Sequence, residues 1–220
     1  SFPQMIWLML RGEVPNDAQA RLLEAALVAA VDHGPQAPSI AAARMAMTCG
    51  LGLNNAMASA VNMLGDVHGG AGEQAVELYH LATETGVAVA LERWTASHGK
   101  FIPGFGHRFH KPVDPRAPRL LALVDEATVA GACEGRFAEV ARDIEKALAA
   151  QKGKPVPMNI DGATAVIFAE LGFAPPLARG IFCLSRSVGI LAHAWEQHQQ
   201  GGRNKGPTPP GYRWTYERSD

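Results

Sequence analysis

Apolar residues recur every three to four positions along most of this chain, which is the spacing of helices that bury one face. Residues 15–34 begin with a capping signal at Asn16 and Asp17, repeat Leu and Ala at helical spacing, and stop at Gly34 and Pro35. Similar patterns cover residues 2–13, 72–99, 116–131, 136–153 and 175–200. Few segments alternate with the period of two that is typical of strands. The pattern therefore predicts an all-α protein.

Two short segments differ from the others because they are rich in Ala and Met and have almost no charge. They are residues 39–50 and 54–65. Small side chains allow helices to approach closely, which suits a dense helical interior. The same lack of charge suits a large apolar interface, so we expect a homodimer with this region near the subunit contact. Burial within one subunit would explain the composition equally well.

Composition excludes several classes of function. The 220 residues carry a net charge of −1, so we expect no general attraction to nucleic acid or membranes. Three widely separated cysteines argue against a disulfide framework and fit a reducing cytoplasm. No apolar run is long enough to span a membrane, and no secretory leader opens the chain. The first residue, Ser1, precedes a helical pattern directly, so we expect that residues upstream are missing.

Four loops interrupt the helical pattern, and each places polar groups beside Gly or Pro. They span residues 31–39, 65–73, 100–116 and 154–163. His33, His68 and His107 lie in three of these loops, and Arg186 stands alone in an apolar helical stretch. Such a set is typical of a catalytic pocket between helix ends. A metal site could use His107 with His110, or His193 with His198, but neither pair has a carboxylate at a familiar spacing, and we expect no metal.

The loops also carry motifs in a recognisable order. They read DHG, HGGA, PGFGH followed by DPR, NIDG and SRSVG. This order resembles the citrate synthase superfamily over nearly the whole chain. The stretches NIDGATAV and SRSVGILAHAWEQ are more similar to citryl-CoA lyase and to the lyase module of ATP citrate lyase. The resemblance implies a large helical domain formed by residues 1–69 and 166–220, with a smaller domain, residues 70–165, inserted between them.

The chemistry of this family requires an enol or enolate of an acetyl thioester. A base must handle the methyl proton, a donor must bind the thioester oxygen, and a third group must handle the proton of the alcohol or ketone oxygen. The resemblance assigns these roles to Asp161, His68 and His107. We expect Gly69 and Gly70 to leave room for the thioester oxygen beside His68, and the helix that follows to favour a neutral imidazole. Asp161 also suits a helix N-terminus, and the two interpretations are compatible.

Substrate carboxylates require cationic or hydrogen-bonding partners. The resemblance implies that His33, Arg116 and Arg186 contact the oxaloacetate part of the ligand. Arg186 has an independent argument, because an arginine in an apolar helix needs an anion, although a structural salt bridge would serve as well. Arg116 could equally begin a helix. In many family members a tail arginine reaches into the active site of the partner subunit. That arginine aligns here with Gly206, and Arg203 or Lys205 is the expected substitute.

Coenzyme A is expected as part of the substrate and not as a bound cofactor. The resemblance implies that the adenine lies on the 100–107 loop and that Asn159 lies near the pantetheine arm. The glycines of this loop would let the adenine approach the backbone, and nearby basic residues suit phosphates. The resulting expected coenzyme A contacts are Lys100, Ile102, Gly104, Phe105, Gly106, Arg108, Lys111 and Asn159.

The sequence thus predicts a cytoplasmic enzyme that cleaves citryl-CoA to acetyl-CoA and oxaloacetate by acid–base catalysis. A citrate or 2-methylcitrate synthase, which would also hydrolyse the thioester, is the alternative within the enzyme class. A catalytically silent coenzyme A-binding module is the alternative of another class. The expected partners are an acyl-CoA, a small dicarboxylate and a second copy of the chain.

Overall fold

The computed structural model describes residues 1–108, 110–204 and 211. Over these residues it contains ten helices and no β-strand, so the all-α prediction is confirmed. The helices are α1 (Phe2–Arg11), α2 (Asp17–Ala29), α3 (Pro38–Thr48), α4 (Leu53–Val61), α5 (Ala71–Thr85), α6 (Val87–His98), α7 (Arg116–Val129), α8 (Arg136–Lys152), α9 (Ile160–Glu170) and α10 (Pro175–Gln200). Within the described part of the chain, no helix is both long and apolar enough to cross a membrane.

Local capping signals explain most of the helix boundaries. Asn16 caps α2 as expected, because its side chain accepts the backbone N–H of Gln19 at 2.9 Å. The amphipathic segment 72–99 is not one helix: it breaks between α5 and α6 at Gly86, whose φ of 84° is accessible mainly to glycine. The apolar period alone carries no signal for this break, because it continues on both sides of Gly86.

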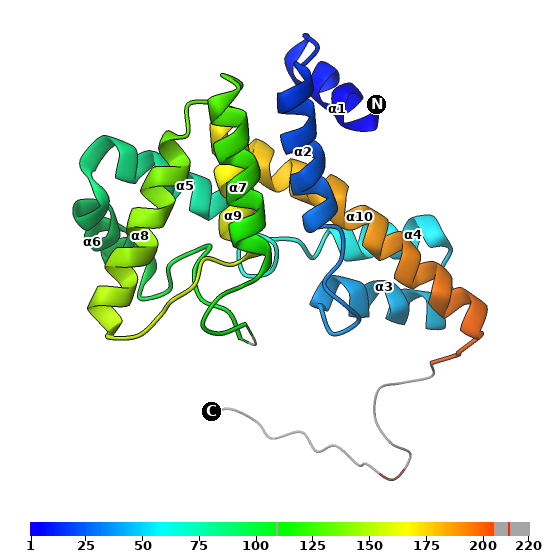
Figure 1. Ribbon diagram of the computed structural model, residues 1–220. Coiled ribbons are helices and arrows are strands. Elements are labelled where there is room, and N and C mark those ends of the chain that lie inside the picture. The colour runs from blue at the N-terminus through cyan, green and yellow to red at the C-terminus, as the bar shows by residue number, and fades with distance from the viewer. Residues whose placement is uncertain (109, 205–210, 212–220) are drawn as a thin grey trace.

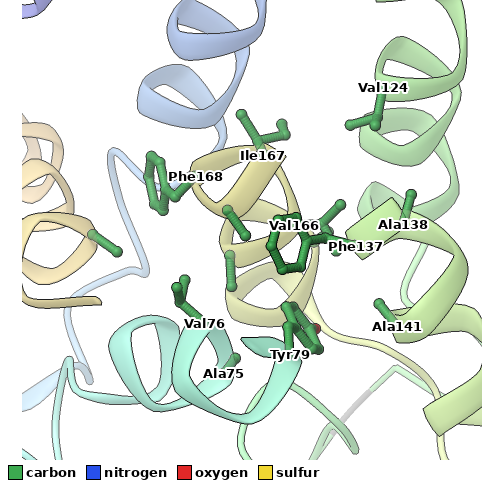
Figure 2. Close-up of a cluster of buried hydrophobic side chains, with 14 of the residues drawn as sticks. Ala75, Val76, Tyr79, Val124, Phe137, Ala138, Ala141, Val166, Ile167 and Phe168 are labelled. Carbon is green, nitrogen blue, oxygen red and sulfur yellow. The ribbon is translucent and has the colours of Figure 1, made fainter. Parts of the chain in front are cut away.

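Helix α9 lies at the centre of the packing. Every residue from Gly162 to Ala169 is buried, which fits a sequence that is apolar on all faces. Figure 2 shows Val166, Ile167 and Phe168 of α9 surrounded by side chains from α5, α7 and α8. Because α9 is held on all sides, its first residues form a rigid platform for the loops that meet there.

The helices form two groups in Figure 1, with α5 to α9 on one side and α1 to α4 with most of α10 on the other. The larger hydrophobic cluster includes residues of both groups, from Trp7 of α1 to Ile181 of α10. A second cluster joins α3 and α4 to the later part of α10, including Ile40, Ala60 and Ile190. The division into domains 1–69 with 166–220, and 70–165, stays a prediction.

A close backbone contact joins the glycine-rich loop to the start of α9. A Cβ atom on Gly104 would lie 2.7 Å from Gly162 Cα, and a Cβ on Gly162 would overlap the carbonyl oxygen of Gly104. Gly104 also requires a φ of 81°. The contact is extended by the backbone of Asn159, which donates to the Gly104 carbonyl at 2.9 Å. Gly104 is therefore required for packing against α9. The sequence analysis assigns the same glycine to the approach of a ligand.

Replacing Gly162 by Ala should destabilise the protein by about 1–3 kcal/mol, because the new methyl group meets backbone atoms that cannot yield easily. Gly180→Ala is the matched control: it is also a helical glycine, but a Cβ there meets no atom within 4 Å. That variant should gain up to about 1 kcal/mol from helix propensity. Urea unfolding of both variants measures the difference, and equal stabilities would contradict the packing argument.

Candidate active site

His68 is held by the start of α3, a different helix from the one that follows it in sequence. Its Nε2 accepts the backbone N–H of Ser39 at 3.1 Å, and the Ser39 hydroxyl lies 2.9 Å from the same nitrogen. Ser39 is fully buried in the first turn of α3. Because Nε2 accepts a hydrogen bond from a backbone N–H, the neutral ring carries its proton on Nδ1.

The surroundings of His68 favour this neutral form. Burial lowers the pKa of His68, and the positive charges of Arg186 and His33 lower it further, while Asp161 acts in the opposite direction. The expected neutral imidazole is thus supported, but the helix that contacts the ring is α3 and not α5. A neutral ring with its proton on Nδ1 remains a hydrogen-bond donor.

The loop that carries His68 is fixed by its own packing and by α10. A Cβ on Gly70 would lie 2.6 Å from the Asp66 carbonyl oxygen, and one on Gly69 would lie 3.1 Å from a Leu64 methyl carbon. These contacts give both glycines a structural reason that differs from the expected clearance for a ligand. Arg179 of α10 donates to Asp66 at 2.5 Å and forms an ion pair with Glu73 in the first turn of α5. Arg179 thereby joins both ends of the loop to α10.

Asp161 lies in the first turn of α9, as its sequence context predicts. Asn159 is the N-cap, and its side chain accepts the backbone N–H groups of Asp161 and Gly162 at 3.0 and 3.1 Å. Burial raises the pKa of Asp161, and the positive charges of Arg186, His33 and Arg116 act against this rise. The pKa of the carboxyl group is therefore shifted toward neutral pH, where the group can both take and return a proton.

His107 and Arg116 lie at opposite ends of one loop. The Nδ1 atom of His107 accepts the backbone N–H of His110 at 3.0 Å, which leaves Nε2 to carry the proton of the neutral ring. Burial lowers the pKa of His107, and the charge of His110 lowers it further. Arg116 begins α7 and binds the fully buried Asp114 through two hydrogen bonds of 3.0 and 2.8 Å. Sequence reasoning missed Asp114, although the DPR motif contains it.

Arg186 is almost completely buried on α10. Its Nε donates to the Ala30 carbonyl at 3.1 Å, and its guanidinium lies 4.7 Å from the centre of the Phe182 ring. Burial lowers the pKa of Arg186, but Asp161 and Asp32 oppose this, and a guanidinium stays charged at neutral pH. The residue therefore places a positive charge beside Asp161.

The structure brings six of the seven predicted catalytic and dicarboxylate-binding residues into one cluster. The charges of His33, His107, Arg116 and Arg186 all act on Asp161, and Asp161 acts in turn on His68. The six residues are His33, His68, His107, Arg116, Asp161 and Arg186. These residues come from five segments that are far apart in the sequence.

Arg203 does not join this cluster within one chain. It is exposed just after α10, where the backbone N–H of Asn204 donates to the Thr48 carbonyl at 3.0 Å. Sixteen residues separate it from Arg186, and most of these belong to α10. Its predicted role in a partner's site stays a prediction, and Lys205 and Gly206 lie outside the described residues.

A groove beside the glycine-rich loop contains most of the expected coenzyme A contacts. A pocket of about 340 Å³ is lined by Lys100, Ile102, Phe105, Gly106 and Arg108, among others. A neighbouring pocket of about 540 Å³ lies between α6 and α8 and shares Lys100, Ile102, Leu148 and Lys152 with it.

Lys152 lines both pockets and was missed by sequence reasoning, although the basic run QKGKP at the end of an amphipathic helix could have indicated it. The remaining expected contacts, Gly104, Lys111 and Asn159, are not among the residues that line either pocket. Gly104 and Asn159 instead join the loop to α9, and the Asn159 side chain donates to the Gly106 carbonyl at 2.9 Å.

One group of residues in the described part of the chain has the composition of a metal site. Ligand atoms of His107, His110 and Asp114 lie within 4.8 Å of one another. The carboxylate that the sequence analysis found missing beside the two histidines is thus Asp114. Both oxygens of Asp114 bind Arg116, and Nδ1 of His107 accepts a backbone N–H, so a metal ion would have to displace these partners. The arrangement favours an ion pair over a metal centre.

A family model described as "Citrate synthase, C-terminal domain" matches residues 1–207. The chain belongs to the citrate synthase family. This finding and the helical fold confirm the resemblance that the motifs indicate.

The chain is similar to solved structures and curated sequences of both lyases and synthases. The citryl-CoA lyase of Hydrogenobacter thermophilus is 34% identical, with a TM-score of 0.84 over 100% of this chain and 86% of that one. The citrate synthase of Haloferax volcanii is 32% identical over 198 residues, which are 87% of this chain and 50% of the relative. The chain spans about half the length of the curated citrate synthases that it matches.

Another member of the citrate synthase fold, the ATP citrate lyase of Methanothrix soehngenii, was solved in complex with citrate and coenzyme A. It has a TM-score of 0.85 over 99% of this chain and 37% of that one, at 23% identity. At this identity the likeness shows the shared fold alone.

Proposed function

We propose that the protein is a citryl-CoA lyase that cleaves citryl-CoA to acetyl-CoA and oxaloacetate. The observation that carries the proposal is the convergence of Asp161, His68 and His107 with the cations Arg116 and Arg186. The family contains both lyases and synthases. The lyase is favoured because the solved citryl-CoA lyase is 34% identical to this chain, whereas the solved citrate synthase of Thermotoga maritima is 25% identical.

The geometry supports a division of labour among three side chains. His107 would accept the hydroxyl proton of citryl-CoA on Nδ1, which exchanges its hydrogen bond from the His110 N–H for the substrate hydroxyl. The carbon–carbon bond then breaks, giving the keto group of oxaloacetate and the enolate of acetyl-CoA. His68 would stabilise the enolate oxygen through its Nδ1–H. Asp161 would then deliver a proton to the enolate carbon, so its raised pKa suits the cleavage direction, which begins with the protonated acid.

The cations of the cluster would bind the carboxylates of the dicarboxylate half. Arg186 is buried, and its Nε donates to the Ala30 carbonyl oxygen, so an incoming carboxylate would offset the cost of burying its charge. Arg116 is oriented by Asp114, which fixes the plane of its guanidinium. The proposal also includes a homodimer, in which the tail of one subunit supplies an arginine to the site of the other. It further includes a location in the cytoplasm.

Separate incubations with synthetic citryl-CoA and with acetyl-CoA plus oxaloacetate test the proposal. A lyase releases oxaloacetate from citryl-CoA without releasing a free thiol. Free coenzyme A thiol formed from acetyl-CoA plus oxaloacetate would instead show a citrate synthase, with propionyl-CoA testing the 2-methylcitrate variant. Coenzyme A binding with no turnover in either reaction would show a silent binding module.

Lys152 provides a test of the coenzyme A groove. Lys152→Gln should weaken the binding of coenzyme A about three- to tenfold, because a phosphate loses one cationic partner. The difference in coenzyme A affinity between Lys152→Gln and the wild type should be smaller at high salt, where the charges are screened. Lys146→Gln on the same helix is the control, since Lys146 is exposed and pairs with Asp143. Calorimetric titration measures both affinities, and unchanged binding by Lys152→Gln would contradict the groove assignment.

A further inference from the structure

His193 belongs to the motif SRSVGILAH, but the proposed chemistry gives it no role. Its Nε2 atom lies 3.2 Å from Oδ1 of Asp32, the residue directly before His33. His193 is 18% exposed and lies on α10, two turns beyond Arg186. The pair thus connects α10 to the turn that carries a predicted substrate-binding residue.

The contact is the last of a series along one face of α10. Ser185 donates to the Leu27 carbonyl at 2.5 Å, and Arg186 donates to the Ala30 carbonyl at 3.1 Å. One turn further, a Cβ on Gly189 would overlap the Val31 carbonyl oxygen, so glycine is required for this approach. The end of α2 and the turn after it therefore follow α10 over three successive turns, and His193 extends the series to Asp32.

The Asp32 carboxylate organises the turn around His33. Burial acts to raise the pKa of Asp32, but the backbone N–H groups of Gly34 and His33 and the hydrogen bond with His193 act to lower it, and the pKa is held below its usual value. Because Asp32 directly precedes His33 in the chain, a rotation of Asp32 would reorient His33.

The other charged groups near His193 are Glu196 and Arg44, and Asp32 is the partner of its Nε2 atom. Glu196 lies 3.9 Å from Nδ1, on the other side of the ring. Glu196 is bound by Arg44 of α3 at 2.5 Å, and Arg44 also binds Gln200 and lies 3.5 Å from the His193 carbonyl. The ring is therefore held between Asp32 and Glu196, with Arg44 neutralising the second carboxylate.

We propose that His193 is a positioning residue: through Asp32 it fixes the orientation of His33 toward the dicarboxylate. The inference rests on the proposed function, because His33 is assigned to the oxaloacetate half of the substrate. His193 touches neither substrate nor reacting atoms in this scheme. Its loss should therefore affect the binding of the dicarboxylate and leave coenzyme A binding unchanged.

The experiment compares five variants of the full chain with the wild type. His193→Ala should raise the dissociation constant of oxaloacetate about tenfold, on the scale of a misplaced binding group. His193→Gln retains a donor near the Nε2 position and should recover most of this loss. Asp32→Ala should match His193→Ala, and the double variant should lose nothing further, because both residues act through one contact. His198→Gln is the control, an exposed histidine on the same helix.

Nitrogen NMR of the histidine rings gives a readout that does not depend on turnover. The His33 resonances should shift in His193→Ala and Asp32→Ala and stay in place in His198→Gln. An unshifted His33 with normal oxaloacetate binding in a folded His193→Ala variant would overturn the inference, as would an additive loss in the double variant. If wild-type protein neither cleaves citryl-CoA nor binds oxaloacetate, the proposed function fails, and the His33 resonances still decide whether His193 positions that ring.

Discussion

Replacing Asp161 by Asn should lower the rate of citryl-CoA cleavage by about a hundredfold or more, the scale of losing a general acid–base group. Asn has nearly the same size and preserves the first turn of α9, but it can neither deliver nor remove a proton at carbon. Because burial raises the pKa of Asp161, the protonated form needed for cleavage persists to higher pH than for an ordinary aspartate. Cleavage by the wild type should therefore decline as pH rises through this raised pKa.

Stopped-flow measurement of oxaloacetate release gives the rate for Asp161→Asn, and calorimetry gives its affinity for coenzyme A, which should change little. Asp143→Asn is the matched control, because Asp143 is exposed on α8 and forms only a surface ion pair with Lys146. Wild-type rates in Asp161→Asn would remove this carboxylate from the mechanism. Condensation should show the opposite pH trend, declining as pH falls, because that direction needs the ionised base.

His68→Ala should also reduce turnover by about a hundredfold or more, since it removes the donor to the enolate oxygen. The hydrogen bond from Ser39 refines this expectation. Because Nε2 is engaged with Ser39, the donor is Nδ1, and the side-chain nitrogen of Asn lies nearer to that position than the nitrogen of Gln. His68→Asn should therefore retain more activity than His68→Gln.

Single-turnover kinetics with citryl-CoA compares these three variants of His68. His98→Ala serves as control because His98 is exposed on α6 and stacks on Trp94. If His68→Gln proved more active than His68→Asn, the tautomer inferred from the Ser39 contact would be wrong. An unaffected His68→Ala would remove the residue from the chemistry altogether.

The helical class and most of the cluster were predictable because they depend on local signals. Helical periodicity fixes the class, and motifs beside Gly and Pro mark the loops that meet at the site. The fully apolar stretch after Asp161 indicates a central helix, and the structure buries it. Arg186 was predictable for the same reason, since an isolated charge in an apolar helix requires a partner.

The contacts between distant segments were not predictable from the chain alone. Nothing near Ser39 indicates that it binds His68, and nothing near Gly104 indicates that Gly162 packs against it. The break at Gly86 lies within a continuous apolar period, so only the backbone conformation reveals it. The basic run QKGKP marks Lys152 as a candidate cation, but only the structure shows that α8 ends beside the glycine-rich loop.

Arg179, Arg186 and His193 are each seven residues apart on α10, which is two helical turns, so all three project from nearly the same side. They contact, in order, the loop of His68, the cluster around Asp161 and the turn of His33. Helix α10 thus fixes the distances between the His68 loop, the cluster around Asp161 and the turn of His33. A one-residue deletion within it would rotate every later contact by about 100°. A change in the number of residues between these three side chains would therefore displace the parts of the site relative to one another.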